Sequence, residues 1–203
     1  YAGVTALRAA RHIVRSEPDA VVLLVSVELS TLHLEDTRSI ESMLAMLQFS
    51  DGAAAAIIRS GPGKVTLGPG LSLALPQSDE LIRWDIGEQG FVMHLSGEVP
   101  HRIEVALGEP ANREALFAGG VPAHLAVHAG GRSILDAVER ALALAPDALA
   151  ASRAVLEASG NMSSATVLFA IAEQMARKVQ GDGLALAFGP GLAAEALKLD
   201  FTP

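Results

Sequence analysis

The sequence predicts an α/β fold in which helices cover layered sheets, and three observations support this class. A helical pattern over residues 3–15 is followed directly by an uninterrupted apolar run over residues 20–27. Segments with helical and with strand character then alternate along the rest of the chain, as in layered α/β proteins. Half of the 203 residues are apolar and only 19% are charged, which indicates a large core or much surface covered by a partner.

The first 60 residues are expected to contain two helices and two strands. Apolar side chains recur every three or four positions in Gly3–Arg15, and Pro18 ends this helix. The run Ala20–Val27 is short and rich in β-branched residues, which predicts a strand buried on both faces in a parallel or mixed sheet. A second helix is expected at Thr37–Leu47, and a strand of small and branched residues at Ala53–Ile58.

The middle of the chain has weaker signals. Ser60–Gly63 is a connector, and we place a boundary there between two halves, residues 1–60 and 61–203. Val65–Leu75 is expected to be extended, with an interruption at its two glycines, and Gly90–Leu95 to be a short strand. For residues 101–107 the periodicity fits either a helix or a strand.

The C-terminal part is expected to contain strands and helices in turn. A short strand at Ala123–Val127 leads into a glycine pair, and two extended runs at Gly183–Phe188 and Ala193–Leu199 predict a terminal hairpin. Between them, helical periodicity predicts three helices, the last with a buried first part: Ser133–Ala143, Ala148–Ala158 and Ser163–Val179.

Composition excludes several classes of function. The net charge is −8 and no basic stripe is present, so nucleic acid is not an expected partner. The chain has no cysteine, which removes disulfides and Cys-based metal sites, and its six histidines show no metal-ligand spacing, so no metal is expected. It has neither a signal-peptide pattern nor an apolar run of the roughly 20 residues that span a bilayer, so a cytoplasmic protein without a membrane span is expected.

A histidine follows an apolar strand in Leu125–Gly131, just before two glycines. His128 therefore lies where a strand leads into a helix, and the glycines allow a backbone or a ligand to come close. A neutral imidazole there can exchange a proton or hold a thiolate as an ion pair. A partly buried histidine bonded to a backbone carbonyl is the alternative interpretation.

Two further segments stand downstream. Asn161, in Ser159–Ser164, precedes an apolar helix and can be its N-cap, or its side-chain amide can donate to a developing oxyanion. Ala187–Gly191, the run Ala-Phe-Gly-Pro-Gly, predicts only a turn when taken alone.

In this order, the three segments resemble the type III polyketide synthases, the chalcone synthase-like family. That family carries a His-x-Gly-Gly segment, then Gly-Asn-Met-Ser-Ser, then Gly-Phe-Gly-Pro-Gly. Upstream, Phe49–Ala55 resembles its Phe-Gly-Asp-Gly-Ala-Ala segment and Val27–Leu32 its Glu-containing strand end. The resemblance implies a thiolase-like α-β-α-β-α layered fold, of which this chain is the C-terminal portion. Three residues depart from the pattern: Ser50, Ala129 and Ala187 stand where the family has glycine, proline and glycine.

The resemblance also implies an enzyme with a Cys-His-Asn triad, in which His128 and Asn161 match the histidine and the asparagine. Tyr1–Arg8 resembles the stretch directly after the nucleophilic cysteine, so that cysteine is expected immediately before Tyr1. The chain is then expected to be a fragment of a longer protein, and a truncated protein is the alternative. No cofactor is implied, and acyl-CoA and malonyl-CoA are the expected substrates of a homodimer.

Further residues match positions that shape the cavity in this family. Phe49 and Met93 match two gatekeepers, and Met93 stands where an aromatic residue is usual. His33 and Trp84 fall near cavity-lining positions, and Ser163 matches a residue beside the triad. Without the resemblance, ordinary core packing would account for Phe49, Met93 and Trp84.

The implied activity is iterative decarboxylative condensation of malonyl-CoA onto an acyl-CoA starter, followed by cyclisation to a pyrone, resorcinol or phloroglucinol. Met93 suggests a roomy pocket and a fatty-acyl starter. A ketoacyl synthase III-like condensing enzyme that uses acyl carrier protein is one alternative. A non-catalytic thiolase-fold subunit that binds acyl-CoA is the other, and the presence of both His128 and Asn161 argues against it.

Overall fold

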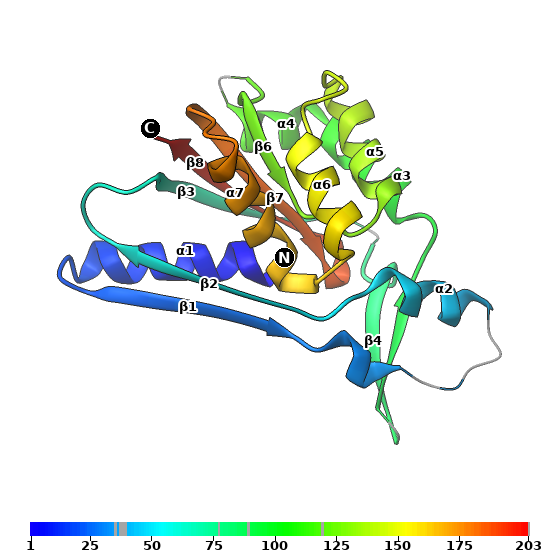
Figure 1. Cartoon of the computed structure of the whole chain (residues 1–203). Coiled ribbons are helices and arrows are strands. Elements are labelled where there is room, and N and C mark those ends of the chain that lie inside the picture. The colour runs from blue at the N-terminus through cyan, green and yellow to red at the C-terminus, as the bar shows by residue number, and fades with distance from the viewer. Residues whose placement is uncertain (35, 37–39, 77, 89, 119, 203) are drawn as a thin grey trace.

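The centre of the fold is a four-stranded mixed sheet in the order β3–β8–β7–β6 (Figure 1). The computed structural model describes residues 1–34, 36, 40–76, 78–88, 90–118 and 120–202. β6 (His124–Val127) is parallel to β7 (Gly181–Gly189), and β8 (Ala193–Phe201) pairs antiparallel with both β7 and β3 (Val65–Ala74). The C-terminal hairpin is thus confirmed, with the turn η3 (Pro190–Leu192) between its strands. The interruption predicted in β3 is a register shift at residues 67–70.

Helices cover both faces of this sheet. Leu184 and Leu186 of β7 pack into a core with α3 and α5, whereas Ala185 and Ala187 pack into a second core with α1 and α7. The alternation follows from the strand period of two, which sends successive side chains to opposite faces. The helices are α1 (Ala2–Ser16), α3 (Val99–Gly108), α4 (Pro110–Phe117), α5 (Arg132–Leu142), α6 (Ala150–Ser159) and α7 (Thr166–Ala176).

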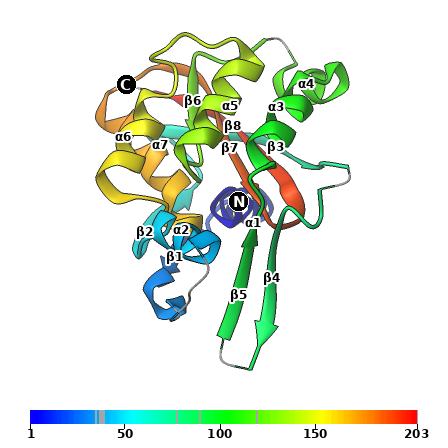
Figure 2. The same ribbon diagram turned by 90° about the vertical axis from the view of Figure 1, so that its right-hand side faces the viewer.

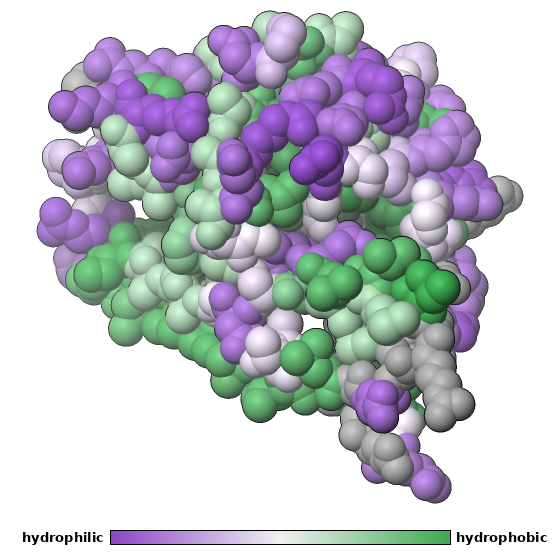
Figure 3. Space-filling model, turned by 45° about the vertical axis from the view of Figure 1, so that its right-hand side comes forward, coloured by the Kyte–Doolittle hydropathy of each residue, from purple (hydrophilic) through white to green (hydrophobic). Residues whose placement is uncertain are grey.

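A second sheet, of two antiparallel strands, lies on the far side of α1 (Figures 1 and 2). It consists of β1 (Val21–Glu28) and β2 (Gly52–Arg59). The expectation that β1 is buried on both faces is wrong for this chain. Leu24 is buried toward α1, but Leu23 and Val25 are 64% and 60% exposed, because alternate side chains point outward and no described residue covers that side. Figure 3 shows this hydrophobic surface along the lower edge of the molecule.

A hairpin projects from the main body beside the α2 region (Figure 2). Its strands are β4 (Ile82–Gly87) and β5 (Gly90–Leu95), and Trp84 lies opposite Met93. The sequence predicted β5 but not β4. The short η1 (Ser30–His33) and helix α2 (Ile40–Gln48) lie nearby, and positions 37–39 of the predicted second helix fall outside the described residues.

Two helical predictions need correction or completion. The undecided segment 101–107 is helical, within α3, and α4 was not predicted. The predicted helix Ser163–Val179 is wrong at both ends, because η2 (Ser163–Ala165) precedes α7 and α7 stops at Ala176. Left-handed backbone at Ser163 (φ 48°) and Lys178 (φ 56°) explains the two limits, since an α-helix cannot include either conformation. The buried first part of α7 is confirmed by Val167 and Leu168.

In the part of the chain that the structure describes, no helix combines the length and the hydropathy that a membrane crossing requires. The proposed boundary between residues 60 and 61 falls in the connector from β2 to β3. The division into two halves stays a prediction.

Candidate active site

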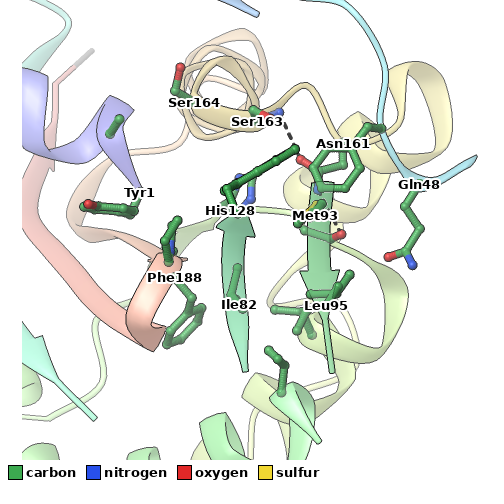
Figure 4. A pocket seen from close by; sticks show the side chains of 18 of the residues that line it. Tyr1, Gln48, Ile82, Met93, Leu95, His128, Asn161, Ser163, Ser164 and Phe188 are labelled. Carbon is green, nitrogen blue, oxygen red and sulfur yellow. Dashed lines mark hydrogen bonds between the residues drawn. The ribbon is translucent and has the colours of Figure 1, made fainter. Parts of the chain in front are cut away.

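A pocket of about 740 Å³ opens between the β4–β5 hairpin, the end of β6, the turn before α7 and the start of α1 (Figure 4). Every residue that the sequence singled out for the site lines it, although these residues come from six separate segments. They are His33, Phe49, Trp84, Met93, His128, Asn161 and Ser163. The structure thus brings the predicted residues together, while their individual roles stay predictions.

His128 lies at the end of β6 and faces the pocket with a buried ring. Its backbone N–H donates to Leu186 O at 2.8 Å, which continues the pairing of β6 with β7. Only 8% of the surface of His128 is exposed. Its Nδ1 atom is buried and has no hydrogen-bond partner among the described residues. Burial lowers the pKa of His128 to about 3, because a charged ring would lose its hydration there. The imidazole is therefore neutral at neutral pH.

Asn161 forms a turn of its own and is not the N-cap of α7. Its Oδ1 accepts from the backbone N–H of Ser163 at 3.0 Å, drawn in Figure 4, and its Nδ2 donates to Gly130 O at 3.1 Å. These two backbone partners fix the orientation of the amide, because a carbonyl needs a donor and an N–H needs an acceptor. The bond to Gly130 uses one of the two Nδ2 hydrogens, so the amide keeps a second hydrogen to donate.

Gly130 connects the two side chains. Its carbonyl accepts from Asn161, and a Cβ built on it would lie 3.5 Å from His128 Nε2. The backbone of Gly130 also bonds back to His128, since its N–H donates to His128 O at 2.9 Å. The first glycine after the histidine therefore holds the imidazole and the amide at the same wall of the pocket.

Residues from β1 and the α2–β2 turn hold the turn that carries Asn161. Asn161 and Phe49 form an isolated parallel bridge, in which Asn161 N–H donates to Gln48 O at 3.2 Å and Ser50 N–H to Asn161 O at 2.9 Å. On the other side, Glu28 Oε1 accepts from the backbone N–H and the hydroxyl of Ser164. Glu28 and Gln48 also line the pocket, and sequence reasoning did not select either of them.

The start of α1 and the loop after β7 close another wall. A Cβ built on Gly189 would lie 1.6 Å from Tyr1 Cδ1, so the tyrosine ring packs directly on the glycine backbone. Only glycine allows this contact. Tyr1 and Ala2 line the pocket together with Gly189 and Pro190. The Phe-Gly-Pro-Gly segment is thus part of the site and more than a connecting turn.

The hairpin contributes the most apolar wall. Ile82 and Leu95 line the pocket beside Met93, and the ring of His33 lies 5.9 Å from that of Trp84, tilted by 55°. Sequence reasoning selected neither Ile82 nor Leu95. Ile82 lies on β4, which was not predicted, and Leu95 ends the predicted β5, but only the pairing of the two strands places both at the pocket. An apolar wall opposite two polar groups suits a ligand with an apolar chain and one reactive polar end.

The arrangement supports chemistry at a carbonyl oxygen. A neutral imidazole and an amide N–H, both in a largely buried environment, can stabilise negative charge that develops on an oxygen between them. Ser163 stands beside them in a left-handed conformation, with φ 48°. Within the described ranges, no group of three His, Asp or Glu side chains is placed to hold a metal ion.

Comparison with known proteins identifies the family. Residues 70–202 match the model for the C-terminal domain of chalcone and stilbene synthases. The chain is 31% identical to 1,3,6,8-tetrahydroxynaphthalene synthase from Streptomyces coelicolor, a bacterial type III polyketide synthase, with a TM-score of 0.91. That match covers 100% of this chain and 60% of the other.

Two further structures are similar as well. The type III polyketide synthase domain of Steely1 from Dictyostelium is 29% identical, with a TM-score of 0.89, over 100% of this chain and 60% of that one. PKS-I from the brown alga Ectocarpus siliculosus is 26% identical, with a TM-score of 0.89, over 99% and 58%. The chain spans about 60% of the length of these relatives.

The expected thiolase-like layering is confirmed by this likeness, since the whole chain superposes on these relatives with TM-scores of 0.89 and 0.91. Because the family model covers well over half of the chain, the chain belongs to the chalcone and stilbene synthase family, the type III polyketide synthases.

Proposed function

We propose that this chain supplies the histidine and the asparagine of a polyketide synthase that condenses malonyl-CoA with an acyl-CoA starter and cyclises the product. The observation that carries the proposal is the joint placement of His128 and Asn161, through Gly130, at one buried wall of an apolar pocket. A site that only held an acyl chain would need no such pair of polar groups facing the pocket.

In the proposed reaction the two side chains act on the thioester oxygen of malonyl-CoA. The bond between Cα and the carboxylate breaks, carbon dioxide leaves, and the electron pair moves through Cα to the thioester oxygen. Asn161 Nδ2–H and a proton on His128 Nε2 stabilise that enolate oxygen. While the cysteine carries an acyl group and no thiolate faces the ring, burial keeps His128 neutral, and a neutral ring with its proton on Nε2 can donate to the enolate oxygen.

Bond formation needs an acyl group held next to the enolate. A cysteine joined to the amino group of Tyr1 would reach the pocket, because Tyr1 and Ala2 line it beside His128. The enolate carbon would attack the acyl thioester on that cysteine, and the thiolate would leave. A thiolate close to His128 would raise the pKa of the ring and favour an ion pair between them.

The apolar wall is proposed to select and fold the growing chain. Phe49 is locked beside Asn161 by the backbone bridge, and Met93 and Trp84 face each other across the hairpin. These residues, with His33 and Ser163, are proposed to shape the cavity, and a fatty-acyl group is the proposed starter. A homodimer is also proposed, which the exposed apolar side chains of Leu44 and Leu47 on α2 support.

The test is decarboxylation of malonyl-CoA, followed as carbon dioxide release by the complete protein that contains this chain. His128→Ala and Asn161→Ala are each expected to lower kcat by roughly 10²–10³, the effect of losing one oxyanion donor. His101→Ala, an exposed histidine on α3, is the matched control and should keep the wild-type rate.

Three results would contradict the proposal. Equal rates of carbon dioxide release in all variants would show that His128 and Asn161 take no part in the reaction. Binding of malonyl-CoA without carbon dioxide release would favour a subunit that only binds acyl-CoA. Activity restricted to malonyl groups on acyl carrier protein would indicate a ketoacyl synthase III-like enzyme.

A further inference from the structure

The turn that presents Asn161 has little regular structure of its own. Helix α6 ends at Ser159, and Gly160 follows in a conformation with φ 69° and ψ −162° that L-residues rarely adopt. The helical hydrogen bonds of α6 end with Gly160 N–H, which donates to Leu156 O at 3.0 Å. The position of the Asn161 amide therefore depends on contacts from other segments.

We propose that Ser50 is a positioning residue for Asn161, which it holds through a side-chain hydrogen bond to the residue on the other side of Gly160. Ser50 lies in the turn before β2 and is half-buried. Its hydroxyl donates to the carbonyl oxygen of Ser159, on the far side of Gly160. Its backbone N–H donates to the carbonyl oxygen of Asn161 at 2.9 Å. One residue thus holds both ends of the peptide segment that contains the glycine.

The two bonds depend differently on the residue at position 50. Any residue except proline can supply the backbone N–H, whereas the bond to Ser159 needs a side-chain hydroxyl. A Cβ built on Gly160 would lie 3.1 Å from Ser50 Oγ, so the turn packs directly against this hydroxyl. Ser50 is also one of the three positions at which the chain departs from the family pattern. This departure supplies the turn with a bond that glycine cannot make.

The hydrogen bonds of Ser50 affect the pocket because they hold the backbone of Asn161, whose side chain lines it. Asn161 Nδ2 must point toward the site while its backbone is anchored, and a shift of about 1 Å in such a group is enough to cost activity. Since Ser50 directly follows Phe49 in the bridge, the same bond also fixes the backbone of Phe49 relative to Asn161. The consequence for catalysis rests on the proposed function, whereas the ordering of the turn does not.

The chain offers a close control. Thr202, after the end of β8 that lies away from the pocket, repeats the pattern of Ser50. Its N–H donates to Lys64 O at 3.0 Å and its hydroxyl to Gly63 O at 2.5 Å. The test compares wild-type complete protein with Ser50→Ala, Ser50→Thr and Thr202→Val. Ser50→Ala removes the hydroxyl and Ser50→Thr keeps it. Thr202→Val removes a hydroxyl with a similar bonding pattern at a site away from the pocket.

The first measurement is amide hydrogen exchange in the native protein. Ser50→Ala is expected to speed exchange of the Asn161 and Ser163 amides on the order of five-fold, the usual net effect of one hydrogen bond. Ser50→Thr should restore protection, and Thr202→Val should leave these amides unchanged. The proposal is wrong if Ser50→Ala leaves their exchange as in the wild type, or if Thr202→Val speeds it equally.

The second measurement is the kinetics of malonyl-CoA decarboxylation by the same four proteins. Ser50→Ala should lower kcat on the order of five-fold with an unchanged KM, and Ser50→Thr should restore kcat. Faster exchange with an unchanged kcat would show that Ser50 orders the turn without positioning Asn161, and would overturn the proposal. A wild-type protein that releases no carbon dioxide would refute the proposed function instead, and the exchange result would still decide whether Ser50 orders the turn.

Discussion

At Gly189 the chain passes so close to the ring of Tyr1 that no side chain fits between them. We expect Gly189→Ala to destabilise the protein, because its Cβ would lie 1.6 Å from Tyr1 Cδ1 and the ring would have to move. Overpacking of this kind costs about 1–3 kcal/mol, which corresponds to a fall in Tm of roughly 2–10 °C for a chain of this size. Thermal unfolding of both proteins, followed by circular dichroism, measures this change in Tm.

The control for this prediction is Gly108→Ala, at the end of α3. A Cβ there meets no heavy atom within 4 Å, so Tm should stay the same or rise slightly. If both alanine variants unfold at the wild-type temperature, Tyr1 does not pack on Gly189 in solution.

The buried ring of His128 makes the stability of the 203-residue chain, which carries no cysteine thiolate beside the ring, depend on pH. In the unfolded chain its pKa is near 6.5, and in the folded protein burial lowers the pKa to about 3. Below pH 6.5 the unfolded state therefore binds a proton that the folded state does not bind. The free energy of unfolding should fall by up to about 1.4 kcal/mol per pH unit as the pH drops from 6.5 toward 3.

Urea denaturation of the wild type and of His128→Gln between pH 7 and pH 4 isolates this contribution, because all other titrating groups are shared. The stability difference between the two proteins should change with pH in favour of the variant on the acid side. Parallel curves would show that the ring is not held neutral in the folded protein.

At the scale of elements, the sequence predicted the strands and helices with strong periodicity and missed those that depend on partners. β4 has no clear alternation of its own and is defined by its pairing with β5. The predicted helix at 163–179 shows the limit of periodicity, because apolar spacing does not reveal the left-handed conformations of Ser163 and Lys178. The motif residues His128 and Asn161 were found from sequence, whereas Glu28, Gln48 and Ser50 reach the turn only through tertiary contacts.

The outward face of β1 should make the 203-residue chain self-associate when it is produced alone. Val21, Leu23, Val25 and Val27 are each at least 58% exposed, and so continuous an apolar strip favours association in water. Replacing Leu23 and Val25 with threonine keeps strand propensity and should weaken association by roughly ten-fold per side chain. Sedimentation velocity measures the change.

A suitable control for this prediction is Ile86→Thr, which removes an apolar side chain that is 85% exposed on β4, away from β1. It should associate as the wild type does. A wild-type chain that stays monomeric at tens of micromolar would contradict the prediction.

At the scale of the whole molecule, all three sheets of the described residues, together with α1, α3 and α5, contribute residues to the wall of the pocket. How these layers contact one another could not be predicted from the sequence, because residues as far apart as 28 and 164 or 50 and 159 are joined only after folding. The motifs located the wall that carries the chemistry. The apolar wall opposite, and the contacts that hold the Asn161 turn, required the three-dimensional arrangement.

The strand order of the central sheet has a consequence for biosynthesis. Among the described strands of that sheet, β6 pairs with β7 and β3 pairs with β8. Neither outer strand, β3 or β6, can therefore join the sheet before the β7–β8 hairpin has formed. During synthesis His128 has left the ribosome long before β7, which begins at Gly181, exists to receive it. The pocket can therefore assemble only after residues 181–201 have been synthesised, because β7 and β8 complete the sheet that carries His128. Until then the apolar strands must be kept from associating, which is a task for chaperones.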